Sequence, residues 1–237
     1  MGINMSLSPL WISLKVALCA TLFTFILGLL AARWVVSLKR GKAFLDGVFS
    51  LPMVLPPTVV GFFLLLLFGR NSLLGNLLLK LGIQVMFTWQ GAVIAAVVVS
   101  FPLMYRTARG ALEQVEQNLI YAARTLGMSE GKIFMRVVLP AVWPGIAAAT
   151  ILAFARALGE FGATIMLVGN IPARTQTMSV AVYTAVQSGD RSLAYRWVAV
   201  IMLISFTTIF LMNYWMGYQE RLRRRGGAKK HVTLRRH

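Results

Sequence analysis

Residues 106–140 read RTARGALEQVEQNLIYAARTLGMSEGKIFMRVVLP and carry five basic side chains between two strongly apolar segments. These segments extend from about Gly91 to Tyr105 and from about Ala141 to Gly169. A membrane span needs about 20 mostly apolar residues, and basic residues gather in the connections on the cytoplasmic side. Because the first segment can be extended at both ends, the stretch predicts a cytoplasmic loop between two membrane spans.

Composition indicates a membrane protein over the whole chain of 237 residues. Charged residues make up only 13% and hydrophobic residues 58%, whereas about 25% of a soluble globular domain is charged. These proportions exclude a cytosolic enzyme and a disordered protein. The single cysteine, Cys19, excludes an internal disulfide, and both histidines lie in the basic tail, so neither a metal site nor a catalytic residue set is predicted.

Three further apolar segments are long enough to span a membrane, which predicts an all-α, polytopic fold with five core transmembrane helices. They are Leu10–Val36, Phe44–Phe68 and Trp197–Tyr218. The chain then divides into a membrane domain, residues 1–218, and a basic tail, residues 219–237. The shorter stretch 73–81 predicts an interfacial helix, and residues 177–186 a re-entrant or surface helix.

A signal peptide is the alternative reading of the first apolar segment. It fits less well, because no basic residue precedes the apolar run and Arg33 ends the run as an anchor would.

The formal net charge of +17 would suggest nucleic acid in a soluble protein. In a membrane protein its distribution predicts topology instead. Seventeen of the 24 basic residues fall in three alternate connections, residues 33–42, 106–136 and 221–236. Five spans then place the N-terminus outside and the tail on the cytoplasmic side, near anionic lipid. No nucleic-acid partner is expected.

The sequence of the cytoplasmic loop predicts two short helices that lie at an angle to each other. Ala122–Ala123 lie on the first, and Gly127 is placed as a helix C-cap. Ser129 is placed to cap the second helix, with Glu130 in its first turn. Leu139–Pro140 would end that helix and start the next span. The residues alone leave open whether this loop is an interfacial linker or a docking element for a cytoplasmic partner.

The same residues resemble a known motif. The spacing of Ala122, Ala123, Gly127, Leu139 and Pro140 is similar to the EAA loop of ABC importer permeases, with Tyr121 at the place of the usual glutamate. Other stretches resemble molybdate permeases: LPMVLPP (51–57) with VVG (59–61), SFPLM (100–104), AFARALGEFGAT (153–164) and GNIP (169–172). The combination resembles the molybdate/sulfate branch of type I ABC importers and leans to molybdate.

The resemblance implies the partners and the mechanism. It implies a homodimer in the inner membrane, two ATPase subunits and an extracytoplasmic oxyanion-binding protein. The loop residues given above would couple ATP hydrolysis to alternating access. ATP and Mg would be bound by the ATPase, because the nearest approach to a P-loop, residues 127–133, is one residue too short and has Ile133 at the hydroxyl position.

Polar residues and prolines inside the spans are the other candidate site. Arg156 and Glu160 are four residues apart, so they would share a helix face and pair. They form either an ion pair that fixes packing or part of a pathway or gate. Pro52, Pro56 and Pro57 remove backbone donors, which predicts either a break that lines a cavity or a static kink.

Several alternatives remain open. A permease for sulfate, thiosulfate or tungstate is the nearest, since these tetrahedral dianions differ little in shape. An ATP-independent secondary transporter or channel is less favoured, because no inverted repeat is evident. A membrane enzyme would lack convergent catalytic residues, and a scaffold would leave the intramembrane charges and prolines unexplained.

Overall fold

The computed structural model describes the backbone of residues 6–234 and the side chains of residues 6–217. In this part of the chain every regular element is a helix, which confirms the all-α fold. Four stretches are long and apolar enough to cross a membrane, and a bent pair of helices makes a fifth if taken as one span. The four are Ser8–Ser37 (α1), Trp89–Glu113 (α5), Glu130–Leu158, and residues Arg191–Gly217 of α11 (Arg191–Leu234).

Helices α1, α5 and α8 (Leu139–Leu158) form the packed centre of the molecule. Small residues let the backbones of α1 and α5 approach closely, as in many membrane helix pairs. Gly28 of α1 faces Met104, and an added Cβ at Gly28 would lie 2.7 Å from the Met104 Cγ. A buried hydrogen bond of 3.1 Å joins the hydroxyls of Thr24 and Ser100 across the same interface.

The predicted span over residues 44–68 is broken. Its two helices, α2 and α3, meet at 109°. Proline explains the break, because the residue before a proline is driven from helical to extended backbone. Leu55 precedes Pro56 and Pro56 precedes Pro57, and their ψ angles are 140° and 136°. The bounds are Lys42–Val54 for α2 and Pro57–Phe68 for α3.

The prediction of one uninterrupted helix over residues 141–169 is wrong. Helix α8 ends at Leu158, and a separate short helix, α9 (Gly162–Val168), follows. The Glu160 side chain stabilises the interruption, because its Oε1 accepts a 2.8 Å hydrogen bond from the Ala163 N–H in the first turn of α9. This contact satisfies one of the backbone donors that a helix N-terminus leaves unpaired.

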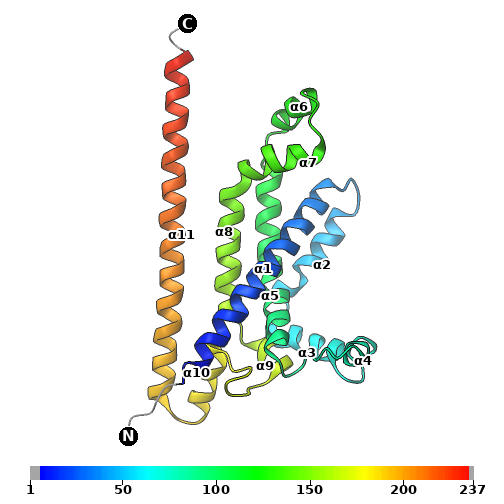
Figure 1. Cartoon of the computed structure of the whole chain (residues 1–237), viewed down its shortest axis with the longest axis vertical. Helices are drawn as coiled ribbons and strands as arrows, with labels where there is room; N and C mark the ends of the chain where they lie inside the picture. The colour runs from blue at the N-terminus through cyan, green and yellow to red at the C-terminus, as the bar shows by residue number, and fades with distance from the viewer. Residues whose placement is uncertain (1–5, 235–237) are drawn as a thin grey trace.

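The basic connections share one end of the molecule. Figure 1 shows the α1–α2 connection, α6 (Gln117–Thr125), α7 (Glu130–Ile133) and the C-terminal end of α11 at one end, and α3, α4 (Leu73–Lys80) and α9 at the other. The bent α2–α3 pair therefore still carries the chain from one end to the other. Which end faces the cytoplasm stays a prediction.

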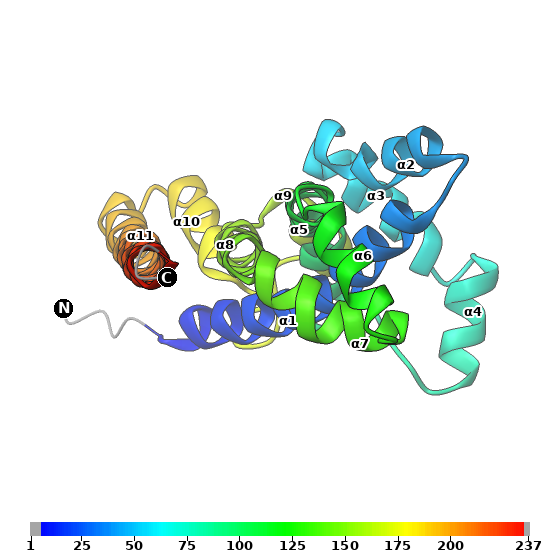
Figure 2. The same ribbon diagram turned by 90° about the horizontal axis from the view of Figure 1, so that it is seen from above.

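The smaller predicted helices are present, although the membrane contacts expected of them stay predictions. Helix α4 (Leu73–Lys80) is separate and short, and α10 (Met178–Gln187) lies close to the predicted bounds. Seen from above, α4 and α11 stand at opposite edges of the molecule (Figure 2). Helix α11 continues past residue 218 without a break, while the side chains of the predicted tail, residues 219–237, lie outside those described.

Candidate functional site

The predicted coupling loop forms the two expected short helices, α6 and α7. Ala123 is buried and Ala122 is exposed, so the two alanines face different surroundings. Gly127 has φ of +71°, the left-handed conformation that glycine adopts without steric cost. The Met128 N–H donates to the Ala123 carbonyl and the Gly127 N–H to the Arg124 carbonyl. These two bonds are a Schellman motif, which confirms the predicted C-cap.

The second helix of the loop does not end at Leu139–Pro140 as predicted. Helix α7 passes through one π-helical turn, Phe134–Val138 (η1), directly into α8. Pro140 has no N–H to donate within a helix. The wider turn beside it, in which the Leu139 N–H donates to the Phe134 carbonyl, accommodates the proline without ending the helix. The loop is therefore joined to its span by continuous helix.

An ion pair and a cation–π contact lie on the surface of the loop. Arg124 of α6 donates to both carboxylate oxygens of Glu130, at 2.6 and 3.2 Å, across the Gly127 turn. The Glu130 carboxylate raises the pKa of the Arg124 guanidinium, but both side chains are exposed, so the pair contributes little to stability. Ser129 occupies the predicted N-cap position, yet its side chain accepts no capping hydrogen bond. The Arg33 guanidinium at the end of α1 lies 4.0 Å above the Phe134 ring.

The Arg156–Glu160 pair forms, although not on one helix face. Arg156 lies in the last turn of α8, and Glu160 lies just past its end, in the interruption before α9. Arg156 Nη1 is 2.8 Å from Glu160 Oε2. The contact is electrostatic, since Oε2 accepts no hydrogen bond. Glu160 is buried, with 2% of its side chain exposed, whereas Arg156 retains 35%, so this pair reaches from the interior towards the surface.

The two helix breaks lie against each other. A Cβ added to Gly162 at the start of α9 would lie 3.0 Å from the Pro57 Cβ, so α9 and α3 are in close contact there. A Cβ at Gly61, one turn further along α3, would lie 2.7 Å from the Ala163 Cα. The structure thus brings Pro57 next to the segment that follows Glu160.

Pro52 is not part of this contact, because it lies inside α2 on the other side of the bend. Whether any of these residues lines a pathway stays a prediction. The sequence-based site also omitted Asp46 of α2, which pairs with Arg109 of α5. An acidic residue inside an apolar segment was the available signal, as it was for Glu160.

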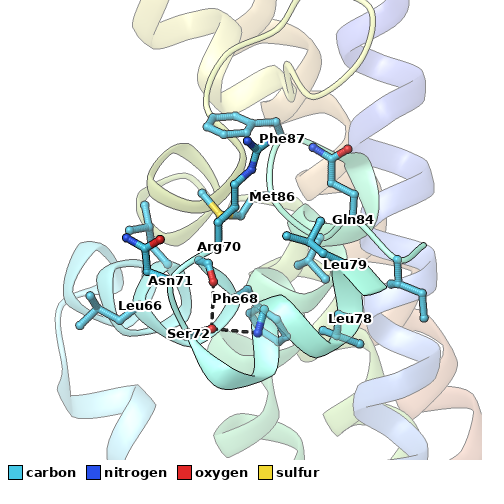
Figure 3. A pocket seen from close by; sticks show the side chains of 15 residues that line it. Leu66, Phe68, Arg70, Asn71, Ser72, Leu78, Leu79, Gln84, Met86 and Phe87 are labelled. Atoms are coloured by element: carbon cyan, nitrogen blue, oxygen red, sulfur yellow. Dashed lines mark hydrogen bonds between the residues drawn. The ribbon is translucent and has the colours of Figure 1, made fainter. Parts of the chain in front are cut away.

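A cavity of about 610 Å³ lies away from these residues. Figure 3 shows that it is lined by residues from the end of α3, from α4 and from the segment that leads to α5. Ser72 links the end of α3 to the start of α4 beside the cavity: its hydroxyl donates to the Gly69 carbonyl at 2.9 Å and accepts from the Gly75 N–H at 2.8 Å. Its lining is mostly apolar with one charged side chain, Arg70. None of the predicted site residues contributes to it.

Among the described residues no group of three or more His, Cys, Asp or Glu side chains is placed to hold a metal ion.

Comparison with known proteins gives consistent matches over most of the chain. Residues 24–225 match the family model described as binding-protein-dependent transport system inner membrane component. The molybdenum transport system permease protein ModB of Escherichia coli is 45% identical over 215 residues, 90% of this chain and 93% of that protein. The sulfate transport system permease protein CysT of Escherichia coli is 36% identical over 204 residues, 85% of this chain and 73% of that protein.

Solved structures agree with the fold. A chain of the MetNI methionine ABC transporter, in inward-facing conformations, superposes with a TM-score of 0.72. The match covers 92% of this chain and 99% of that one, at 17% identity. At this identity the likeness supports the fold alone.

Proposed function

The chain belongs to the family of binding-protein-dependent transport system inner membrane components, and from this premise we propose that it is the permease subunit of an ATP-driven importer for molybdate. The observation that supports molybdate as the substrate is the 45% identity to the ModB permease over 90% of the chain. The sulfate permease CysT is more distant, at 36% identity, and this chain covers 73% of it against 93% of ModB.

The chain itself is the transport subunit and not the catalyst of ATP hydrolysis. In this proposal a second copy of the chain completes the pathway, and two ATPase subunits bind ATP and Mg. An extracytoplasmic binding protein delivers the oxyanion to the outer mouth. The loop of α6 and α7 supports the scheme, because it projects at the end of the molecule where the basic connections gather (Figure 1).

Coupling would pass from the loop into the membrane through continuous helix. Motion of a bound ATPase reaches α7, and the π-helical turn joins α7 to α8 without a flexible linker. At its far end α8 carries Arg156, whose partner Glu160 caps α9. Because α9 packs on α3, movement of α8 would reach the bend between α2 and α3. Alternating access would then follow from a change at the two adjacent breaks.

The test is uptake of radiolabelled molybdate by cells that lack this chain and by cells in which it is restored. We expect uptake only in the restored cells, with competition by tungstate and little competition by a large excess of sulfate. Inactivating ATP hydrolysis by the partner ATPase should abolish uptake. Uptake that persists with the inactive ATPase would indicate a secondary transporter, and stronger competition by sulfate than by tungstate would indicate a sulfate permease.

A further inference from the structure

A polar cluster fastens α2 to α5 outside the sites described above. The Asp46 carboxylate of α2 pairs with the Arg109 guanidinium and accepts a 2.9 Å hydrogen bond from the Tyr105 hydroxyl. Arg109 has a second carboxylate partner on its own helix, since its Nε donates to Glu113 Oε1 at 2.9 Å. The cluster is only partly exposed: the Arg109 side chain retains 19% of its accessible surface and Asp46 37%.

Aromatic contacts support the same junction. The Phe49 ring of α2 meets the rings of Phe101 and Tyr105 edge to face, at centroid distances of 5.5 and 5.2 Å. Phe101 and Tyr105 stack on each other along α5. No residue of α2 is fully buried. The position of α2 therefore depends largely on this cluster and on the partly buried Leu45 and Phe49 side chains.

The two halves of the broken span are held by different helices. Helix α2 packs mainly on α5, whereas α3 packs mainly on α9 through the close approach at Gly61. Between them lies the 109° bend, where the backbone at Leu55 and Pro56 is extended. Releasing α2 from α5 would let it swing about this bend while α3 stays in place.

We propose that Asp46, Tyr105 and Arg109 form a latch that holds α2 against α5, and that Glu113 allows this latch to open during transport. When Asp46 moves away with α2, Arg109 keeps its pairing with the Glu113 carboxylate, so the guanidinium is not left unpaired. The Asp46 side chain is already about one-third exposed, and after this movement water would solvate its carboxylate. A guanidinium suits this exchange because it presents several donors in a rigid fork. The residues act as positioning residues, since they set where α2 lies relative to the bend.

The inference rests on the proposed function for its role in transport. Helix α5 ends at Glu113, and the first helix of the coupling loop, α6, begins at Gln117. Arg109 therefore lies one turn before the end of α5, close in sequence to the segment on which the ATPase would act. Movement of that segment would change the distance between Arg109 and Asp46 directly.

The test measures the separation of α2 and α5 in the complete transporter in nanodiscs. Spin labels replace the exposed residues Phe44 of α2 and Gln114 at the end of α5, in a Cys19→Ser background that removes the one native thiol of this chain. In the wild type we expect the shorter distance to dominate without nucleotide, with a minor population at a longer distance that grows when ATP is bound. Asp46→Asn should raise the population at the longer distance without nucleotide about two- to five-fold, as expected for a partly exposed ion pair.

Glu113→Gln is the matched control, because it neutralises the competing carboxylate and should shift the population the opposite way. Asp46→Glu should restore the wild-type distribution. If both neutralising variants shift the population in the same direction, or if neither shifts it, the latch is wrong. The distance measurement needs no substrate. If the wild-type transporter shows these shifts but takes up no molybdate, the substrate proposal is overturned and the latch is not.

Discussion

At the scale of single residues, the two candidate sites depend on a few exact backbone and charge requirements. Gly127 needs left-handed backbone, with φ of +71°, to end α6. Glu160 serves two partners at once: Oε1 accepts from the Ala163 N–H and Oε2 faces Arg156. A substitution at either position therefore has a consequence that its local geometry defines.

Replacing Gly127 with valine should weaken association with the ATPase. A β-branched side chain in left-handed backbone costs about 1–2 kcal/mol, so the turn between α6 and α7 would change conformation. The measurement is the amount of ATPase that co-purifies with the chain. Gly217→Val, outside the loop, is the control, because Gly217 has ordinary φ and no atom within 4 Å of an added Cβ. Unchanged assembly and uptake in Gly127→Val would contradict the role of the loop.

Glu160→Gln should destabilise the protein by about 1–3 kcal/mol, because it keeps an acceptor for Ala163 but leaves Arg156 without a charge partner. Thermal unfolding in detergent measures the loss, and the double variant Arg156→Met/Glu160→Gln should recover most of it. Molybdate uptake by that double variant then separates the two interpretations of the pair. Normal uptake indicates packing alone, and lost uptake in a stable protein indicates a gate. A wild-type melting temperature for Glu160→Gln would refute the ion pair.

At the scale of elements, interrupted helices are the main feature. The α2–α3 bend and the α8–α9 interruption lie against each other, with Pro57 close to Gly162. Interrupted helices leave backbone groups that need partners, so within a membrane they occur where protein or a water-filled cavity surrounds them. Their contact here depends on the close packing of α3 on α9.

Gly61→Ala tests that packing. The added methyl group would lie 2.7 Å from the Ala163 Cα, which is backbone and cannot move aside as a side chain can. We expect a loss of about 1–3 kcal/mol in stability, seen as a lower melting temperature, together with reduced uptake. Gly47→Ala is the matched control: Gly47 lies in α2 with no atom within 4 Å of an added Cβ. It should be neutral or stabilising by up to about 1 kcal/mol. Equal effects of the two changes would disprove the close contact.

At the scale of the whole molecule, the charge distribution and the helix arrangement agree. The connections at 33–42 and 106–136 lie at the same end as the C-terminal end of α11 (Figure 1). Basic residues are retained on the cytoplasmic side, so this end should face the ATPase.

Reporter fusions test the orientation. Green fluorescent protein fused after residue 237 should fluoresce, and alkaline phosphatase at the same site should be inactive, because the C-terminus is expected in the cytoplasm. Phosphatase fused after Pro172, an exposed residue in the connection between α9 and α10, should be active. The reverse pattern would mean that the chain has the opposite orientation, with the basic end outside the cell.

The sequence alone determined the membrane class, the all-α fold, the approximate spans and the family, because these depend on composition, run length and motif spacing. It also located the Gly127 turn, since a left-handed C-cap is a local requirement. Only the tertiary structure decided that the second and fourth spans are interrupted and that their breaks meet. Hydrophobicity measures how apolar a segment is and not how its backbone hydrogen bonds are satisfied. The contacts of Pro57 with Gly162 and of Asp46 with Arg109 join residues 105 and 63 positions apart, which no local pattern pairs.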